Sequence, residues 1–86
     1  MKEYLPIGSV VLLKNGKKRI MIYGRRQLNA DKVLFDYVAC LYPEGNINDD
    51  YNFLFNNEDI DKVVFRGYSD EEDKEFIDML NDVGNK

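Results

Sequence analysis

The sequence predicts an α+β fold that is mostly β: a small curved antiparallel sheet of about five strands, close to an SH3-like partial barrel, with a C-terminal helix. Two observations carry this prediction. Short runs of β-branched and aromatic residues recur between clusters of Gly, Pro, Asn and Asp, and a helical apolar period occurs only near the C-terminus. The length of 86 residues suits a single domain over residues 1–86.

The first two strands are expected at residues 7–14 and 17–24, joined by Asn15-Gly16. An Asn-Gly pair favours positive φ at both central residues of a type I′ hairpin turn. In the returning strand Ile20 and Ile22 are expected on one face, and Arg19, Met21 and Tyr23 on the other.

Three further strands are predicted at residues 32–42, 51–55 and 62–68. The first of these is apolar at both parities, which is typical of a strand in the interior of a sheet. Asp36 interrupts its pattern and is expected to lie on the less buried face. A loop over residues 43–50 precedes the next strand, because turn-forming Pro, Gly, Asn and Asp dominate it.

A helix is predicted over residues 70–83. Ser69 followed by Glu72 matches a capping box, and the acidic run over residues 70–73 suits the positive end of the helix dipole. The expected buried stripe of this helix comprises Phe76, Ile77, Leu80 and Val83. The acidic run therefore has a structural explanation that requires no catalytic carboxylates.

Composition argues against catalysis. The chain contains no histidine, which excludes histidine-based acid–base chemistry, catalytic triads and the common zinc sites. Cys40 is the only cysteine and lies within a predicted strand, where a thiol usually acts as a small hydrophobe. Glycine-rich phosphate loops and the ligand spacing of a calcium loop are both missing from the sequence. We therefore expect no enzyme activity, no cofactor and no metal.

No signal peptide and no apolar run of membrane-spanning length is found, so a cytoplasmic protein without a membrane partner is expected. The net charge of −4 divides unevenly along the chain. Residues 1–32 hold eight Lys/Arg against two Asp/Glu, whereas residues 33–86 hold four against fourteen. In a small folded domain these opposite charges lie close enough to offset each other.

Two surfaces are candidates for binding. A protein partner would be held by tyrosines at strand ends and by neighbouring arginines: Tyr23, Arg25, Arg26, Tyr42 and Tyr68. A nucleic acid would instead be held by the basic residues around the first hairpin: Lys17, Lys18, Arg19, Arg25 and Arg26. The same cations could serve only to shield strand edges, and nucleic acid is the less favoured partner.

Three stretches, LPIGSVVLLKNGKKRIMIYGRRQ, FDYVACLYPEG and FNNEDIDKVVFRGYSDEEDKEF, resemble a family of small Gram-positive proteins described as a domain of unknown function, DUF4176. The resemblance runs from about residue 5 to residue 80. Its motif positions are mostly turn formers, which could equally define the fold: Pro6, Gly8, Gly24, Tyr42, Pro43, Glu44, Gly45, Gly67 and Tyr68.

Members of that family are encoded near type VII secretion genes, often beside toxins with an LXG targeting domain. The resemblance implies a non-catalytic adaptor or chaperone that binds a secreted toxin's targeting domain, and it brings no catalytic residues. A small nucleic-acid-binding β-barrel domain is the alternative function.

Overall fold

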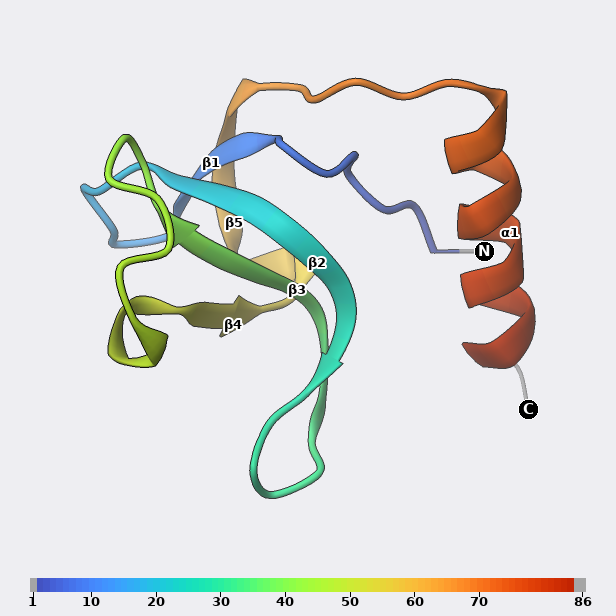
Figure 1. The fold of residues 1–86 in the computed structure, drawn as a ribbon, viewed down its shortest axis with the longest axis horizontal. Helices are drawn as coiled ribbons and strands as arrows, with labels where there is room; N and C mark the ends of the chain where they lie inside the picture. The colour runs from blue at the N-terminus through green and yellow to red at the C-terminus, as the bar shows by residue number, and fades with distance from the viewer. Residues whose placement is uncertain (1, 85–86) are drawn as a thin grey trace.

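The structure is a computed structural model that describes residues 2–84 (Figure 1). In this range the chain forms five strands, two short 3-10 turns and one α-helix. The strands are β1 (Val10–Leu13), β2 (Ile20–Leu28), β3 (Leu34–Leu41), β4 (Phe53–Phe55) and β5 (Ile60–Phe65). The helix is α1 (Glu71–Gly84), and the 3-10 turns are η1 (Asp49–Tyr51) and η2 (Asn57–Asp59).

All five strands belong to one antiparallel sheet with the order β4-β3-β2-β1-β5. The first strand thus lies between the second and the last, and the sheet ends at β4 on one side and β5 on the other. The sheet does not close into a barrel. The predicted fold class is confirmed: a mostly β, α+β protein with a five-stranded antiparallel sheet and a C-terminal helix.

The core lies on one face of the sheet and is built around Tyr37, which is fully buried. Val11, Ile22 and Phe55 are also buried there, and the Tyr37 and Phe55 rings pack with centroids 5.4 Å apart. Ile20 and Ile22 share one face of β2 as predicted, and both belong to this core. From α1 only Ile77 and Leu80 pack against this cluster.

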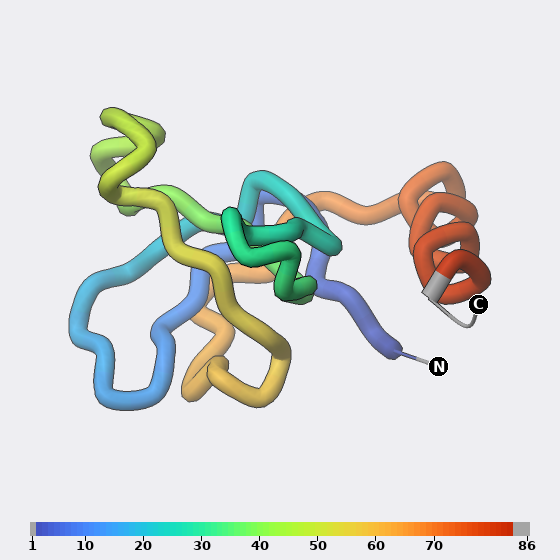
Figure 2. Tube along the Cα trace, turned by 90° about the horizontal axis from the view of Figure 1, so that it is seen from below, coloured from blue at the N-terminus to red at the C-terminus, as the bar shows by residue number. Residues whose placement is uncertain are grey.

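The chain before β1 runs from the sheet towards α1, which lies to one side of the sheet (Figures 1 and 2). Backbone groups of Lys2 form two hydrogen bonds with Asn81 of α1, at 3.1 and 2.9 Å. The Tyr37 hydroxyl accepts a hydrogen bond from the Leu5 N–H and donates one to Asn57. This N-terminal segment therefore links the helix to the sheet.

The first hairpin differs from the predicted type I′ turn. Asn15 has a φ of 65°, but Gly16 has no positive φ, and the β1–β2 pairing ends at Val11 and Ile20. At its other edge β1 pairs with β5 along its whole length, and the Lys14 N–H donates to the Asp59 carbonyl oxygen. The connection between β1 and β2 is therefore longer than a two-residue turn.

Strand limits also differ from those predicted. The first strand begins at Val10, not at residue 7, because the chain turns at Gly8 (φ 91°). The second continues to Leu28 through an irregularity between Ile22 and Gly24 and a positive φ at Arg26. The fourth begins at Phe53, because the residues before it form η1. β3 is shorter than the predicted strand 32–42, and β5 begins and ends earlier than the predicted strand 62–68.

Asp36 lies on the face of β3 away from the core residues Tyr37 and Ala39, as predicted, but its side chain is buried. Its carboxylate accepts a hydrogen bond from the Asn57 N–H at 2.8 Å and pairs with the Lys2 Nζ at 2.7 Å. The hydrogen bond to Asp36 raises the pKa of Lys2. A buried carboxylate is tolerated here because its oxygens are paired.

The helix cap lies one residue later than predicted. The Asp73 N–H donates to Asp70 Oδ1 at 3.0 Å, so Asp70 takes the capping role that the sequence assigned to Ser69. The Ser69 hydroxyl instead donates to Asp73 Oδ2 at 2.8 Å. Of the predicted stripe, Phe76 and Val83 are exposed.

Candidate functional site

The face of the sheet opposite the core carries an apolar row that opens at the edge strand β5. Directly opposed residues of antiparallel strands lie on the same face. The pairs Cys40–Met21, Met21–Val10 and Val10–Phe65 therefore place four side chains in one row across β3, β2, β1 and β5. Cys40 and Val10 are only 3% and 6% exposed, whereas Phe65 at the sheet edge is 61% exposed.

A register irregularity in the β1–β5 pair places a second apolar side chain beside this row. Val10 pairs with Phe65 and Val11 with Val63, so Val64 is an extra residue opposite the β1 backbone. Val64 and Phe65 line one open hollow of about 400 Å³, and we call this the β5 hollow. Its lining residues are Gly8, Val10, Arg19, Met21, Tyr42, Val64 and Phe65.

Arg19 and Tyr42 form the polar wall of the β5 hollow. The Arg19 guanidinium lies 5.1 Å from the centre of the Tyr42 ring, a favourable cation–π distance. The Tyr42 N–H also donates to the Arg19 carbonyl oxygen at 3.1 Å. The β5 hollow thus combines an apolar floor, one aromatic ring and one cation beside a strand edge.

The five residues predicted to bind a protein partner are divided among different places. Tyr42 lines the β5 hollow, whereas Tyr68 lies beside the N-terminus of α1 in a separate groove. Tyr23 is in neither, and its burial against neighbouring groups raises its pKa. Arg26 lines a third depression near Lys2 and Asp36.

Arg25 is engaged inside the molecule. Its Nη2 donates to Asp73 Oδ1 of α1 at 2.7 Å, and its guanidinium lies 5.5 Å from the centre of the Phe76 ring. Burial acts to raise the pKa of Asp73, but hydrogen bonds from Arg25 and Ser69 outweigh it and hold that pKa below its usual value. Arg25 therefore joins β2 to α1, and it lies beside the same groove as Tyr68.

The predicted nucleic-acid residues do not form one uncommitted basic surface. Lys18 pairs with Glu44 at 2.8 Å, and this contact lowers the pKa of Glu44. Arg19 lies over Tyr42 and Arg25 is buried, while Lys17 is exposed. This arrangement does not favour the nucleic-acid alternative over protein binding.

Sequence patterns alone do not indicate Val64 and Phe65 as site residues. Both lie in a run that reads as an ordinary buried strand, KVVF, and only the position of β5 at the sheet edge makes them accessible. Among residues 2–84, no three His, Cys, Asp or Glu side chains are grouped as metal ligands. No helix in that range has the length and apolarity needed to cross a membrane.

Fold and surface together define a small α+β protein whose open antiparallel sheet presents an apolar hollow at one free edge. The chain belongs to the family described as a domain of unknown function (DUF4176), whose model matches residues 4–76. Comparison with curated proteins and with solved structures found no match. The family match ends at Phe76, within α1.

Proposed function

We propose that this chain is a non-catalytic protein-binding module that receives an extended segment of a partner protein at the free edge of β5. In this role it serves in the cytoplasm as an adaptor or chaperone for a type VII secretion effector. The observation that carries the proposal is the exposure of Val63, Val64 and Phe65 on a strand with only one neighbour, β1.

An edge strand presents backbone N–H and C=O groups that a second strand can pair with. Soluble proteins commonly protect such edges with charges or Pro, or cover them. The last three residues of β5 are apolar and include no Pro, so that protection is lacking in the half of the strand beside the hollow. A partner strand would gain main-chain hydrogen bonds from the edge and side-chain contacts from the hollow.

The effector role follows from the resemblance to proteins encoded near type VII secretion genes. An adaptor must hold a partner segment without modifying it, which an open hollow beside a strand edge suits. The LXG targeting domain of a neighbouring toxin is the partner that we propose, and Arg19 would help to orient it at the hollow.

Co-purification with the targeting domain encoded in the same locus tests this proposal. Val64→Lys should weaken the complex by about tenfold or more, because it puts a charge into the apolar hollow. Val33→Lys is the matched control: Val33 is 50% exposed and Val64 43%, but Val33 lies outside β5 in the β2–β3 loop.

Both variants should keep the far-UV circular dichroism of the wild type, since each replaces an exposed side chain. Retained binding by Val33→Lys together with loss by Val64→Lys would support the proposal. If the wild-type chain binds no protein of its locus, or if both variants bind equally well, the proposal fails.

A further inference from the structure

Helix α1 carries apolar side chains on a flank that the other residues of the described range leave exposed. Ile77 and Leu80 pack against the core, whereas Phe76, Met79 and Val83 are between 43% and 53% exposed. Their spacing of three and four residues places these three side chains along one line of the helix. A helix that serves only to cover the sheet needs a single apolar stripe.

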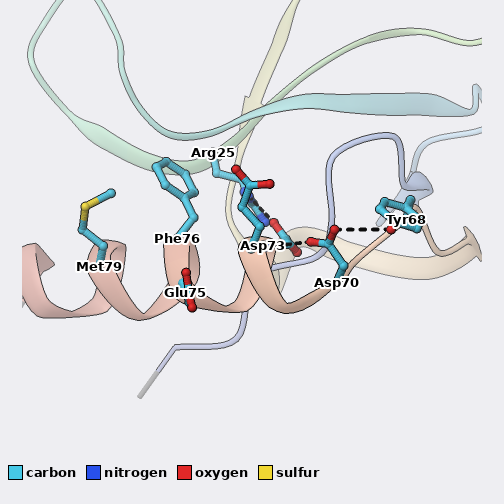
Figure 3. A pocket seen from close by; sticks show the side chains of 8 residues that line it. Arg25, Tyr68, Asp70, Asp73, Glu75, Phe76 and Met79 are labelled. Carbon is cyan, nitrogen blue, oxygen red and sulfur yellow. Dashed lines mark hydrogen bonds and ion pairs between the residues drawn. The ribbon is translucent and has the colours of Figure 1, made fainter.

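The exposed flank forms one wall of an open groove of about 590 Å³, which we call the α1 groove (Figure 3). Its lining residues are Arg25, Tyr68, Asp70, Glu72, Asp73, Glu75, Phe76 and Met79. Figure 3 shows Phe76 and Met79 projecting from α1 on the side where Arg25 lies. The Arg25–Asp73 pair and the stacking of Arg25 on Phe76 fix the base of the groove.

Negative charge borders this apolar floor. Asp73 is paired with Arg25, and Asp70 caps the helix. The side chains of Glu72 and Glu75 form no hydrogen bond or ion pair with any residue in the described range 2–84. Figure 3 shows Glu75 on α1. Residues 71–84 contain one Lys and six Asp/Glu, so the helix is more acidic than the chain as a whole.

We propose that the α1 groove binds a cationic amphipathic helix of a partner protein. Apolar residues of that helix would cover Phe76 and Met79, and its Lys or Arg side chains would meet Glu72 and Glu75. The pairing has the form of helix-against-helix docking with electrostatic selection of the partner. It rests on the proposed role as a protein-binding module, but it uses a surface separate from the β5 hollow.

A two-heptad peptide of the pattern LKKLLKL, labelled with a fluorophore, is the probe. Fluorescence anisotropy at low salt should show saturable binding to the wild-type chain. A Leu/Glu peptide of the same pattern tests charge, and a Gly/Lys peptide of the same charge tests the need for an apolar face. Both should bind at least about tenfold more weakly, because each lacks one of the two complementary features.

Two pairs of variants locate the site. Glu72→Gln/Glu75→Gln should weaken binding of the LKKLLKL peptide by about fivefold or more, whereas Asp78→Asn/Asp82→Asn should have little effect. Both double variants remove two negative charges from α1, but Asp78 and Asp82 do not line the groove. Met79→Ser should weaken binding, and Leu28→Ser, which removes a somewhat more exposed apolar side chain elsewhere (62% against 53%), should not.

Equal loss in the two acidic double variants, or equal binding of the Gly/Lys peptide, would overturn the proposal by reducing it to nonspecific charge attraction. Concentration-dependent self-association that Glu72→Gln/Glu75→Gln abolishes would assign the groove to a second copy and would also overturn it. Val64→Lys at the β5 hollow should leave peptide binding unchanged, so this proposal and the proposed function can fail independently.

Discussion

Arg25 and Asp73 form an ion pair that joins the sheet to the C-terminal helix, with 2.7 Å between Nη2 and Oδ1. Only 4% of the Arg25 side chain and 15% of the Asp73 side chain are exposed. The second Arg25 nitrogen, Nη1, donates to the Leu5 carbonyl oxygen at 3.4 Å, so one guanidinium contacts the N-terminal segment as well as α1. The position of α1, and with it the α1 groove, depends on this pair.

Removal of one partner should destabilise the fold strongly. Asp73→Ala leaves the Arg25 charge buried without a carboxylate, and such a loss typically costs about 3 kcal/mol or more. Glu71→Ala is the control on the same helix: the Glu71 side chain is 88% exposed and makes a long contact of 3.5 Å with Lys74. This substitution should change stability by less than about 0.5 kcal/mol. Urea unfolding followed by circular dichroism measures both. Equal unfolding midpoints would contradict the assigned role of Asp73.

The same pair should make stability depend on pH in the acid range. The pKa of folded Asp73 lies below its usual value of 3.8, so the folded state binds this proton less readily than the unfolded state. The stabilisation is present above the unfolded pKa and is lost as the pH falls through the folded pKa.

Comparison with Asp73→Asn isolates this group, because all other carboxylates titrate in both proteins. The wild type should be the more stable at neutral pH, and its advantage should shrink as the pH falls below about 4. Urea unfolding at a series of pH values is the measurement. A difference that stays constant down to acid pH would show that ionisation of Asp73 does not contribute.

Gly67 is expected to tolerate no side chain. A Cβ at this position would overlap the Ile7 carbonyl oxygen and lie 3.0 Å from the Ser9 nitrogen, and both are backbone atoms that cannot turn away. Gly67→Ala should therefore cost about 2 to 3 kcal/mol. Gly16→Ala, whose Cβ would lie 3.2 Å from the Leu13 carbonyl oxygen, should cost less. Thermal unfolding compares the two, and a smaller cost at Gly67 would refute the close approach.

The local patterns predicted the fold class correctly because each strand carries its own signal. Ile20 and Ile22 lie on one face of β2 as expected, and both belong to the core. Errors occurred where distant segments decide local structure. Asp36 is buried because Lys2 and Asn57 reach it from other parts of the chain, which no local pattern indicates.

The candidate sites were harder to predict for the same reason. Its position at a strand end indicated Tyr42 as a site residue, and Tyr42 does line the β5 hollow. No local pattern could show that Arg25 is buried against α1. Val64 and Phe65 resemble core residues in the sequence, and their exposure follows only from the position of β5 at the edge of the sheet. The apolar period of α1 predicts one stripe from Phe76 to Val83 that packs on the sheet, whereas both of these end residues are exposed.

Hydrogen exchange of the backbone amides, with and without the LXG targeting domain of the same locus, tests the central claim most directly. Addition of a partner strand should slow exchange in β5 (Ile60–Phe65), where edge amides gain hydrogen bonds, and should leave β4 at the opposite edge unchanged. A bound complex in which β5 exchanges as fast as in the free protein would contradict binding at this edge.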